Sequence, residues 1–269
     1  MASGNLTIVI AGIPIRVMCE NAWLVESLTR RYADFLGKDD GGFSVCVNWR
    51  DGSRAEMGAY PPVEFADAGI LLRWPGYQGI ISSSQAVARL EISTRQPVED
   101  VDYFLRLICA FLAFQAGGIV LHGAGVVRNS RSYLFLGKSG SGKTTVAQLS
   151  TDGIVLNDDL IALMPDEDGW LAYATPFTNS TQTPPHAGSA RVAGLFRLVQ
   201  DKVVYLEALS RAVCMAELIA SVPVVASDPR LAGDLMERCK NLINIHPIRN
   251  LHFRKDAEFW RVIEKRGQF

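Results

Sequence analysis

The sequence predicts an α/β protein in which a small α+β unit precedes a larger unit of alternating strands and helices. Two observations point to this architecture. In the first third of the 269 residues, short stretches of alternating apolar residues are separated by Gly- and Asp-rich segments, which is typical of strands joined by loops. From residue 119 onward, strand-like and helix-like segments follow one another, as they do in α/β sheets. We therefore expect two units, residues 1–110 and residues 111–269.

The composition is that of a packed protein with an ordinary surface. Hydrophobic residues make up 48% of the chain and charged residues 20%, so the apolar content suffices for a core and a mostly disordered chain is excluded. The 27 basic and 28 acidic residues nearly cancel. This balance argues against a general nucleic-acid binder, because such proteins need a basic surface.

The first unit is expected to consist mainly of strands. Residues 6–11 and 15–18 flank Gly12, which predicts a strand, a turn and a second strand. Asn21 stands in a capping position before apolar residues at helical spacing, and Gly37 is expected to end this helix. Further strands are predicted at residues 43–49, 70–74, 80–82 and 88–93, and loops at residues 39–42 and 51–58.

The junction between the units is expected near residues 96–118. A helix is predicted for residues 98–115, because its apolar residues follow helical spacing and two glycines come directly after it. The second unit is expected to contain strands at residues 119–122, 133–136 and 154–156, a helix after Gly142, and amphipathic helices at residues 207–219 and 231–243. The C-terminal charges alternate in sign, which is typical of a solvated face.

Several features favour a cytoplasmic location. The first residues lack the basic start of a signal peptide, and the longest apolar stretch, residues 105–121, is interrupted by polar residues and glycines. No membrane span is therefore expected. The five cysteines are odd in number and form no Cys-x-x-Cys pair, which indicates reduced, structural thiols.

The most informative segment is glycine-rich. It reads Gly-Lys-Ser-Gly-Ser-Gly-Lys-Thr and matches the phosphate-binding pattern Gly-x-x-x-x-Gly-Lys-[Ser/Thr] between a predicted strand and a predicted helix. Glycines let successive backbone N–H groups face phosphate oxygens, and the helix start adds partial positive charge. Lys143 is expected to neutralise the β- and γ-phosphates and Thr144 to bind Mg²⁺. The predicted nucleoside triphosphate site comprises Gly137, Lys138, Ser139, Gly140, Ser141, Gly142, Lys143, Thr144 and Thr145.

Two carboxylates follow fifteen residues after the lysine. A short helix, a turn and a short strand account for the interval between Lys143 and Asp158. We expect this strand to lie beside the phosphate-loop strand, with the carboxylates of Asp158 and Asp159 at the end where α/β proteins bind ligands. Adjacent residues of an extended chain point to opposite faces, so one carboxylate would bind a metal while the other faces a substrate. A solvated turn is the alternative, because Asn-Asp-Asp also favours turns.

These motifs together resemble a known family. The segments Leu121-His122-Gly123, residues 137–145 and Leu156-Asn157-Asp158-Asp159 resemble, in order and spacing, the catalytic domain of HPr kinase/phosphorylase. That family is a branch of the phosphate-loop proteins akin to phosphoenolpyruvate carboxykinases. It includes smaller kinases that modify ribosomally made peptides, such as lasso peptides, at a serine. The resemblance in these motifs covers residues 119–160.

The resemblance implies a role for each matching residue. Asp158 is similar to the carboxylate that accepts the proton of the attacking serine hydroxyl, and Lys143 to the essential phosphate-binding lysine. Thr144 and Asp159 are implied as magnesium ligands, with ATP and Mg²⁺ as cofactors. His122 matches an active-site histidine, although a lone histidine between Leu121 and Gly123 is equally well explained as an ordinary strand or loop residue.

The expected function is an ATP- and Mg²⁺-dependent kinase acting on a serine hydroxyl of a peptide or protein. A nucleotide-binding regulatory protein without phosphotransfer and a small-molecule kinase are the alternatives. Residues 186–195 lack the glutamate of the bifunctional enzymes, so neither phosphorylase activity nor HPr as substrate is implied.

Other segments complete the expectations. Residues 175–185, rich in Thr, Ser and Pro, predict a surface loop or a lid over the phosphates. The first unit is the candidate for recognising the acceptor. No nucleic-acid or membrane partner is expected, and the oligomeric state stays open.

Overall fold

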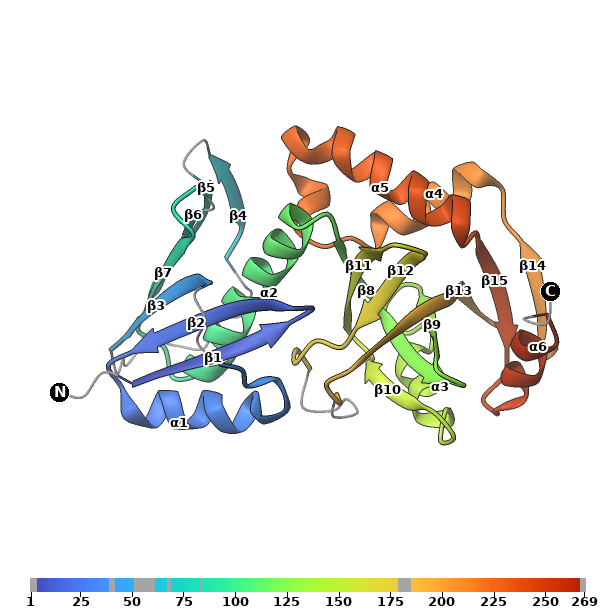
Figure 1. Cartoon of the computed structure of the whole chain (residues 1–269), viewed down its shortest axis with the longest axis horizontal. Coiled ribbons are helices and arrows are strands. Elements are labelled where there is room, and N and C mark those ends of the chain that lie inside the picture. The colour runs from blue at the N-terminus through green and yellow to red at the C-terminus, as the bar shows by residue number, and fades with distance from the viewer. Residues whose placement is uncertain are drawn as a thin grey trace. The chain divides into compact units, whose positions relative to one another are not determined.

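A computed structural model describes residues 4–38, 42–50, 61–66, 69–82, 84–178 and 185–266. Within these residues the chain is a mixed α/β protein with two β-sheets and six α-helices (Figure 1). It divides into two compact units, Met1–Leu112 and Ala113–Phe269. The loop predicted at residues 51–58 lies outside the described residues, as do residues 39–41 of the loop predicted at 39–42 and residues 179–184 of the predicted surface loop or lid.

The first unit is built on a seven-stranded sheet with the order β1-β2-β3-β7-β6-β5-β4. Its strands are β1 (Gly4–Ile10), β2 (Ile13–Cys19), β3 (Phe43–Trp49), β4 (Val63–Ala66), β5 (Gly69–Trp74), β6 (Tyr77–Ser82) and β7 (Val87–Ile92). Burial alternates along β3 and β7, so one sheet face carries the core. Helices α1 (Ala22–Arg31) and α2 (Pro97–Gln115) meet where the Tyr32 hydroxyl donates to Asp102 at 2.9 Å.

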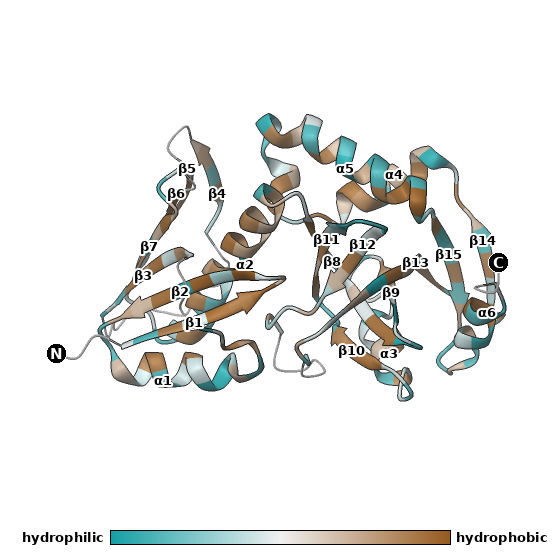
Figure 2. Ribbon diagram, in the orientation of Figure 1, coloured by the Kyte–Doolittle hydropathy of each residue, from teal (hydrophilic) through white to brown (hydrophobic). Residues whose placement is uncertain are grey.

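The sequence predicted most of this unit. Asn21 caps α1 as expected, its side chain accepting from the Leu24 N–H at 3.0 Å. The predicted helix is α-helical only to Arg31, and a 3₁₀ turn (Ala33–Phe35) follows before Gly37. Strand β4 was not predicted, since four residues are too few to show a clear alternation. Figure 2 shows the predominantly hydrophobic ribbon of α2, and apolar residues of this helix such as Phe104 and Ile108 are buried.

In its described residues the second unit contains an eight-stranded sheet and four α-helices. Its strands are β8 (Ile119–Arg128), β9 (Arg131–Leu136), β10 (Ile154–Asn157), β11 (Leu160–Asp166), β12 (Gly169–Tyr173), β13 (Ser189–Gln200), β14 (Tyr205–Ala208) and β15 (Ile248–Phe253). The helices are α3 (Lys143–Leu149), α4 (Arg211–Ala220), α5 (Ala232–Ile245) and α6 (Glu258–Arg266). The pairings β8–β9, β9–β13, β13–β12, β12–β11 and β11–β8 close a ring of five strands, and β15 and β14 extend the sheet from β13.

One predicted strand pairing is wrong. We expected the strand before the aspartates to lie beside the phosphate-loop strand, but β10 pairs with β8. Because Gly125 pairs with Leu134 of β9 and also with Asn157 of β10, β8 lies between the two strands. A local pattern predicts a strand but not its partner, since pairing is decided by the whole sheet.

Two further expectations need correction. β8 runs to Arg128, so His122 lies within the strand and not at its end. The helix predicted at residues 207–219 begins only at Arg211, because Glu207 and Ala208 belong to β14. Ser210 caps this helix by accepting from the Val213 N–H. None of the described helices is long and apolar enough to cross a membrane.

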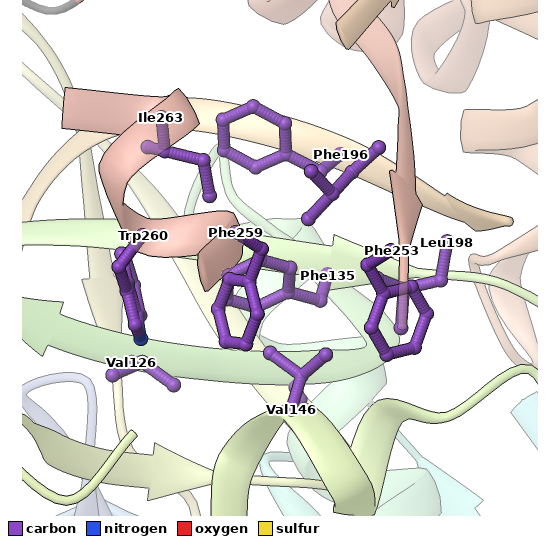
Figure 3. Packing of buried hydrophobic residues seen from close by; sticks show 11 residues of the cluster. Val126, Phe135, Val146, Phe196, Leu198, Phe253, Phe259, Trp260 and Ile263 are labelled. Atoms are coloured by element: carbon purple, nitrogen blue, oxygen red, sulfur yellow. The ribbon is translucent and has the colours of Figure 1, made fainter. Parts of the chain in front are cut away.

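Helices α3 and α6 share an apolar core with the sheet. Figure 3 shows Val146 of α3 pointing toward Phe259 of α6, with Phe253 of β15 beside them. All three side chains are at most 2% exposed. Burial of such residues contributes about 1.5–3 kcal/mol each. The core therefore fixes the start of α3 against the end of β15.

Candidate functional site

The glycine-rich loop, residues 137–142, joins β9 directly to α3. Gly137, Gly140 and Gly142 have φ angles of +147°, +79° and +108°, a backbone conformation that other residues rarely adopt. At Gly142 a Cβ would also lie 2.6 Å from the Phe253 ring. The glycines thus allow the tight turn, and the apolar core holds its last residue in place.

Lys143 is the first residue of α3 and is only 8% exposed. Its Nζ donates to the carbonyl oxygens of Gly137 at 2.7 Å and Lys138 at 3.1 Å, so the side chain folds back over the loop. Burial lowers the pKa of Lys143, while the charges of Asp159 and Asp158 oppose this shift. The ammonium group therefore lies between the loop carbonyls and two carboxylates.

β10 and β11 both pair antiparallel with β8, one after the other along it, and the two aspartates lie between these two strands. β10 pairs with residues 125–127, and β11 pairs with residues 119–122. The register shifts between Val155 and Asn157, and after Asn157 the next paired residue is Leu160. Asp158 and Asp159 fall in the gap and are 1% and 6% exposed. Irregularities of this kind re-aim side chains and are frequent next to functional sites.

Asn157 fixes the backbone around the aspartates. Its Oδ1 accepts from the N–H groups of Asp159 at 2.6 Å and Leu160 at 3.1 Å. Its Nδ2 donates to the carbonyl oxygens of Thr175 at 2.8 Å and Phe177 at 2.9 Å. Asn157 is fully buried, so these bonds replace the ladder that the interruption breaks.

His122 joins the site through Asp159. Its Nδ1 lies 3.0 Å from Oδ1 of Asp159, and the N–H of Gly123 donates to the Asp159 carbonyl at 2.9 Å. The His122 side chain is 45% exposed, whereas the Asp159 side chain is 8% exposed. An imidazole at this position both orients the carboxylate and faces solvent.

A single pocket of about 350 Å³ collects most of the predicted site. Its lining includes His122, Ser139, Gly140, Gly142, Lys143, Thr144, Thr145, Asp158 and Asp159. Gly137 and Lys138 instead supply the carbonyl oxygens that hold Lys143. The buried Ser141 Oγ packs against Gly137, where a Cβ would lie 2.6 Å away. The three segments that carry the sequence motifs therefore converge on one place.

Two residues of the pocket were not predicted. Gln200, the last residue of β13, donates from Nε2 to the Gly140 carbonyl at 2.8 Å. Lys255, just beyond β15, also lines the pocket. Both lie far from the motifs in sequence. Gln200 reaches the loop because β13 pairs with β9, and Lys255 reaches it because β15 in turn pairs with β13. Lys255 belongs to the C-terminal charges of alternating sign, and no local signal separates it from them.

The part of the chain that the structure describes holds no group of three or more His, Cys, Asp or Glu side chains arranged for a metal. The side-chain oxygens of the pocket include the carboxylates of Asp158 and Asp159, and the remaining ones belong to Ser139, Thr144, Thr145 and Gln200. Hard divalent cations such as Mg²⁺ prefer oxygen donors and often retain waters and phosphate ligands, so this donor set is compatible with Mg²⁺.

No protein-family model matches the sequence, and no curated protein matches it either.

Proposed function

We propose that the protein is an ATP- and Mg²⁺-dependent kinase that transfers the γ-phosphoryl group to a serine hydroxyl of a peptide or protein. In this proposal the second unit is a phosphate-loop domain of the HPr kinase/phosphorylase kind. The observation that carries it is the shared pocket of Lys143, Asp158 and Asp159 beside a glycine-rich strand-to-helix loop. Such a pocket would offer a cation and backbone amides to the phosphates, and carboxylates to the acceptor hydroxyl.

Lys143 and the loop amides would hold the phosphates. The Nζ group already has its donors directed at the loop, so phosphate oxygens would replace the carbonyls of Gly137 and Lys138 as acceptors. Thr144 and Asp159 would hold Mg²⁺, which supplies positive charge to the phosphate oxygens when bound. With so few protein oxygens, the remaining ligands would be phosphate and water.

Asp158 would act on the acceptor. It is 1% exposed yet lines the pocket, so a hydroxyl reaches it only from within the pocket. In the proposed step the Asp158 carboxylate accepts the serine proton while the serine oxygen forms a bond to the γ-phosphorus. The bond from that phosphorus to the β–γ bridging oxygen breaks, and ADP leaves. His122 would position Asp159 through the 3.0 Å contact.

The localisation and partner proposals follow from this chemistry. A peptide-directed kinase of this kind is proposed to act in the cytoplasm, without a nucleic-acid or membrane partner. A nucleotide switch without phosphotransfer is the main competing function. The buried carboxylates of Asp158 and Asp159 in the pocket beside the glycine-rich loop favour the kinase, since a switch needs no base for an acceptor hydroxyl.

A transfer assay separates these functions. The purified chain would be incubated with γ-labelled ATP, Mg²⁺ and a library of serine-containing peptides, alongside matched peptides with alanine in place of serine. Label in the serine peptides alone supports the proposal. ATP binding without transfer to any peptide supports the switch, and label in added polyols or sugars would indicate a small-molecule kinase.

A further inference from the structure

The second unit contains another pocket, of about 330 Å³, whose lining residues differ entirely from those of the phosphate-loop pocket. It is formed by the start of β9, the middle of β13, one residue of β14, the end of α5, the start of β15 and one residue of α6. β9 begins at Arg131 in this pocket and ends just before the glycine-rich loop. Six residues of extended chain span roughly 20 Å, so the two pockets lie at opposite ends of the strand.

The charged side chains of this pocket are basic and not acidic. Arg131 and Arg249 line it, and its lining contains neither Asp nor Glu. Within the described residues neither arginine has a carboxylate at ion-pair distance. Other arginines of the unit do, as in the pairs Arg128–Glu264 at 2.6 Å, Arg191–Asp168 at 2.7 Å and Arg197–Glu217 at 3.4 Å. Arginines directed at a concave surface without an acidic partner are typical of anion recognition.

Apolar side chains form part of the remaining lining. Phe196 and Ile263 are buried, and Leu206 is partly buried against the same core. His246 also lines the pocket, and burial lowers its pKa, so it adds hydrogen-bonding capacity more than charge at neutral pH. The pocket therefore joins a cationic rim to an apolar floor.

An irregularity in β13 falls within the lining of this pocket. The β9–β13 register shifts between Val192 and Gly194, which leaves Ala193 as an extra residue in the strand. A Cβ at Gly194 would lie 2.9 Å from the Phe196 ring. The glycine thus allows the aromatic ring to form the floor.

We propose that this pocket binds a small organic anion whose carboxylate or phosphate group contacts Arg131 and Arg249 and whose apolar body packs on Phe196, Leu206 and Ile263. The volume lies at the lower end of the range for small-molecule sites. This site is independent of the proposed nucleotide site, because the two share no lining residue.

Methyl NMR tests the proposal directly. The full chain, with Leu and Ile methyls labelled, would be titrated with phenyl phosphate, benzoate and benzyl alcohol in the presence of a saturating non-hydrolysable ATP analogue with Mg²⁺. We expect saturable shifts of the Leu206 and Ile263 methyls with at least one of the two anions, and at least tenfold weaker binding of the uncharged alcohol. The tighter of the two anions identifies the head group.

Variants locate the site. Arg131→Gln and Arg249→Gln are each expected to weaken binding of the preferred anion about tenfold. Arg261→Gln, an exposed arginine of α6 outside the pocket, is the matched control and should leave the affinity unchanged. Circular dichroism would verify that the variants fold. Gly194→Val is a second variant that should weaken anion binding, because its side chain would meet the Phe196 ring. Absence of saturable shifts to 10 mM of either anion, or equal affinities in the arginine variants and the control, would overturn the proposal.

Discussion

The Nδ1 atom of His122 lies 3.0 Å from Oδ1 of Asp159, across the boundary between β8 and the interrupted strand β10–β11. The contact joins a half-exposed imidazole to a buried carboxylate. It exists because Gly123 and Asp159 also share a backbone hydrogen bond of 2.9 Å, which sets the two residues in register. The imidazole therefore determines how one of the two carboxylates is oriented in the pocket.

A double-mutant cycle tests this relationship. His122→Ala and Asp159→Asn are each expected to lower phosphoryl transfer, and the double variant to be little worse than the poorer single variant. Residues in one hydrogen-bonded pair couple by about 0.5–3 kcal/mol. Initial rates at saturating nucleotide would measure the coupling. Fully additive losses would show that His122 acts independently of Asp159.

Asn157→Ala is expected to destabilise the second unit by about 3 kcal/mol. The substitution removes hydrogen bonds to Asp159, Leu160, Thr175 and Phe177 in a fully buried position, and unsatisfied buried groups cost about 1–3 kcal/mol each. Urea unfolding followed by tryptophan fluorescence would measure the change. Asn241→Ala, an exposed asparagine bonded to Trp170, should lose about 1 kcal/mol. Similar losses in both variants would contradict the role of Asn157.

Two glycines of the loop separate backbone strain from steric conflict. Gly140→Ala adds a Cβ into open space at a positive φ and should cost about 1–2 kcal/mol. Gly142→Ala adds the same strain and also places Cβ 2.6 Å from Phe253. It should destabilise the protein more and weaken nucleotide binding further. Thermal unfolding and nucleotide titration would compare them, and equal effects would mean that Phe253 does not constrain the loop.

Lys255→Ala should weaken nucleotide binding about fivefold. The lysine lines the pocket beside the glycine-rich loop. In the proposed function its charge would therefore act on bound phosphates at short range. The effect should shrink at high salt, because exposed charges are screened. Lys240→Ala on α5 removes an exposed lysine outside the pocket and provides the control. Calorimetric titration at two salt concentrations would measure both, and equal affinities would remove Lys255 from the site.

Alkylation should distinguish the cysteines. Burial raises the pKa of Cys109 and of Cys239 to about 12, so at pH 8 almost none of either thiol is the reactive thiolate. Cys46 is the half-buried cysteine of the five. We expect iodoacetamide to modify Cys46 first in the native protein and the other two only after unfolding. Peptide mapping by mass spectrometry would reveal the order, and early modification of Cys109 would contradict its burial.

Patterns over a few consecutive residues predicted those parts of the site that consist of consecutive residues. The glycine-rich segment with its flanking strand and helix, and the strand before Asp158, follow from turn chemistry and apolar alternation over a few residues. The position of Gln200 depends on the parallel pairing of β13 with β9, and the position of Lys255 on the parallel pairing of β15 with β13. In both pairings the partners are more than fifty positions apart in the sequence. Such pairing depends on side-chain packing across the whole sheet, which a short pattern does not encode.

The pairing partner of β10 was predicted wrongly for the same reason, because pairing depends on packing across the whole sheet. Its apolar residues predicted a strand correctly, yet its partner is β8 and not β9. The sequence also gave no reason to single out Asn157, because Asn-Asp-Asp is equally compatible with an exposed turn. Only the buried carbonyls of Thr175 and Phe177 explain why the side chain faces inward.

The most direct test of the proposed kinase is the Asp158→Asn variant, with ATP affinity and single-turnover transfer to a serine peptide measured on the same sample. Asp201→Asn, an exposed carboxylate outside the pocket, is the control. The proposal predicts that Asp158→Asn binds MgATP within about threefold of the unsubstituted chain while transfer falls at least a thousandfold. Transfer at the unsubstituted rate by Asp158→Asn would contradict the assignment of Asp158 as the base and, with it, the proposed mechanism.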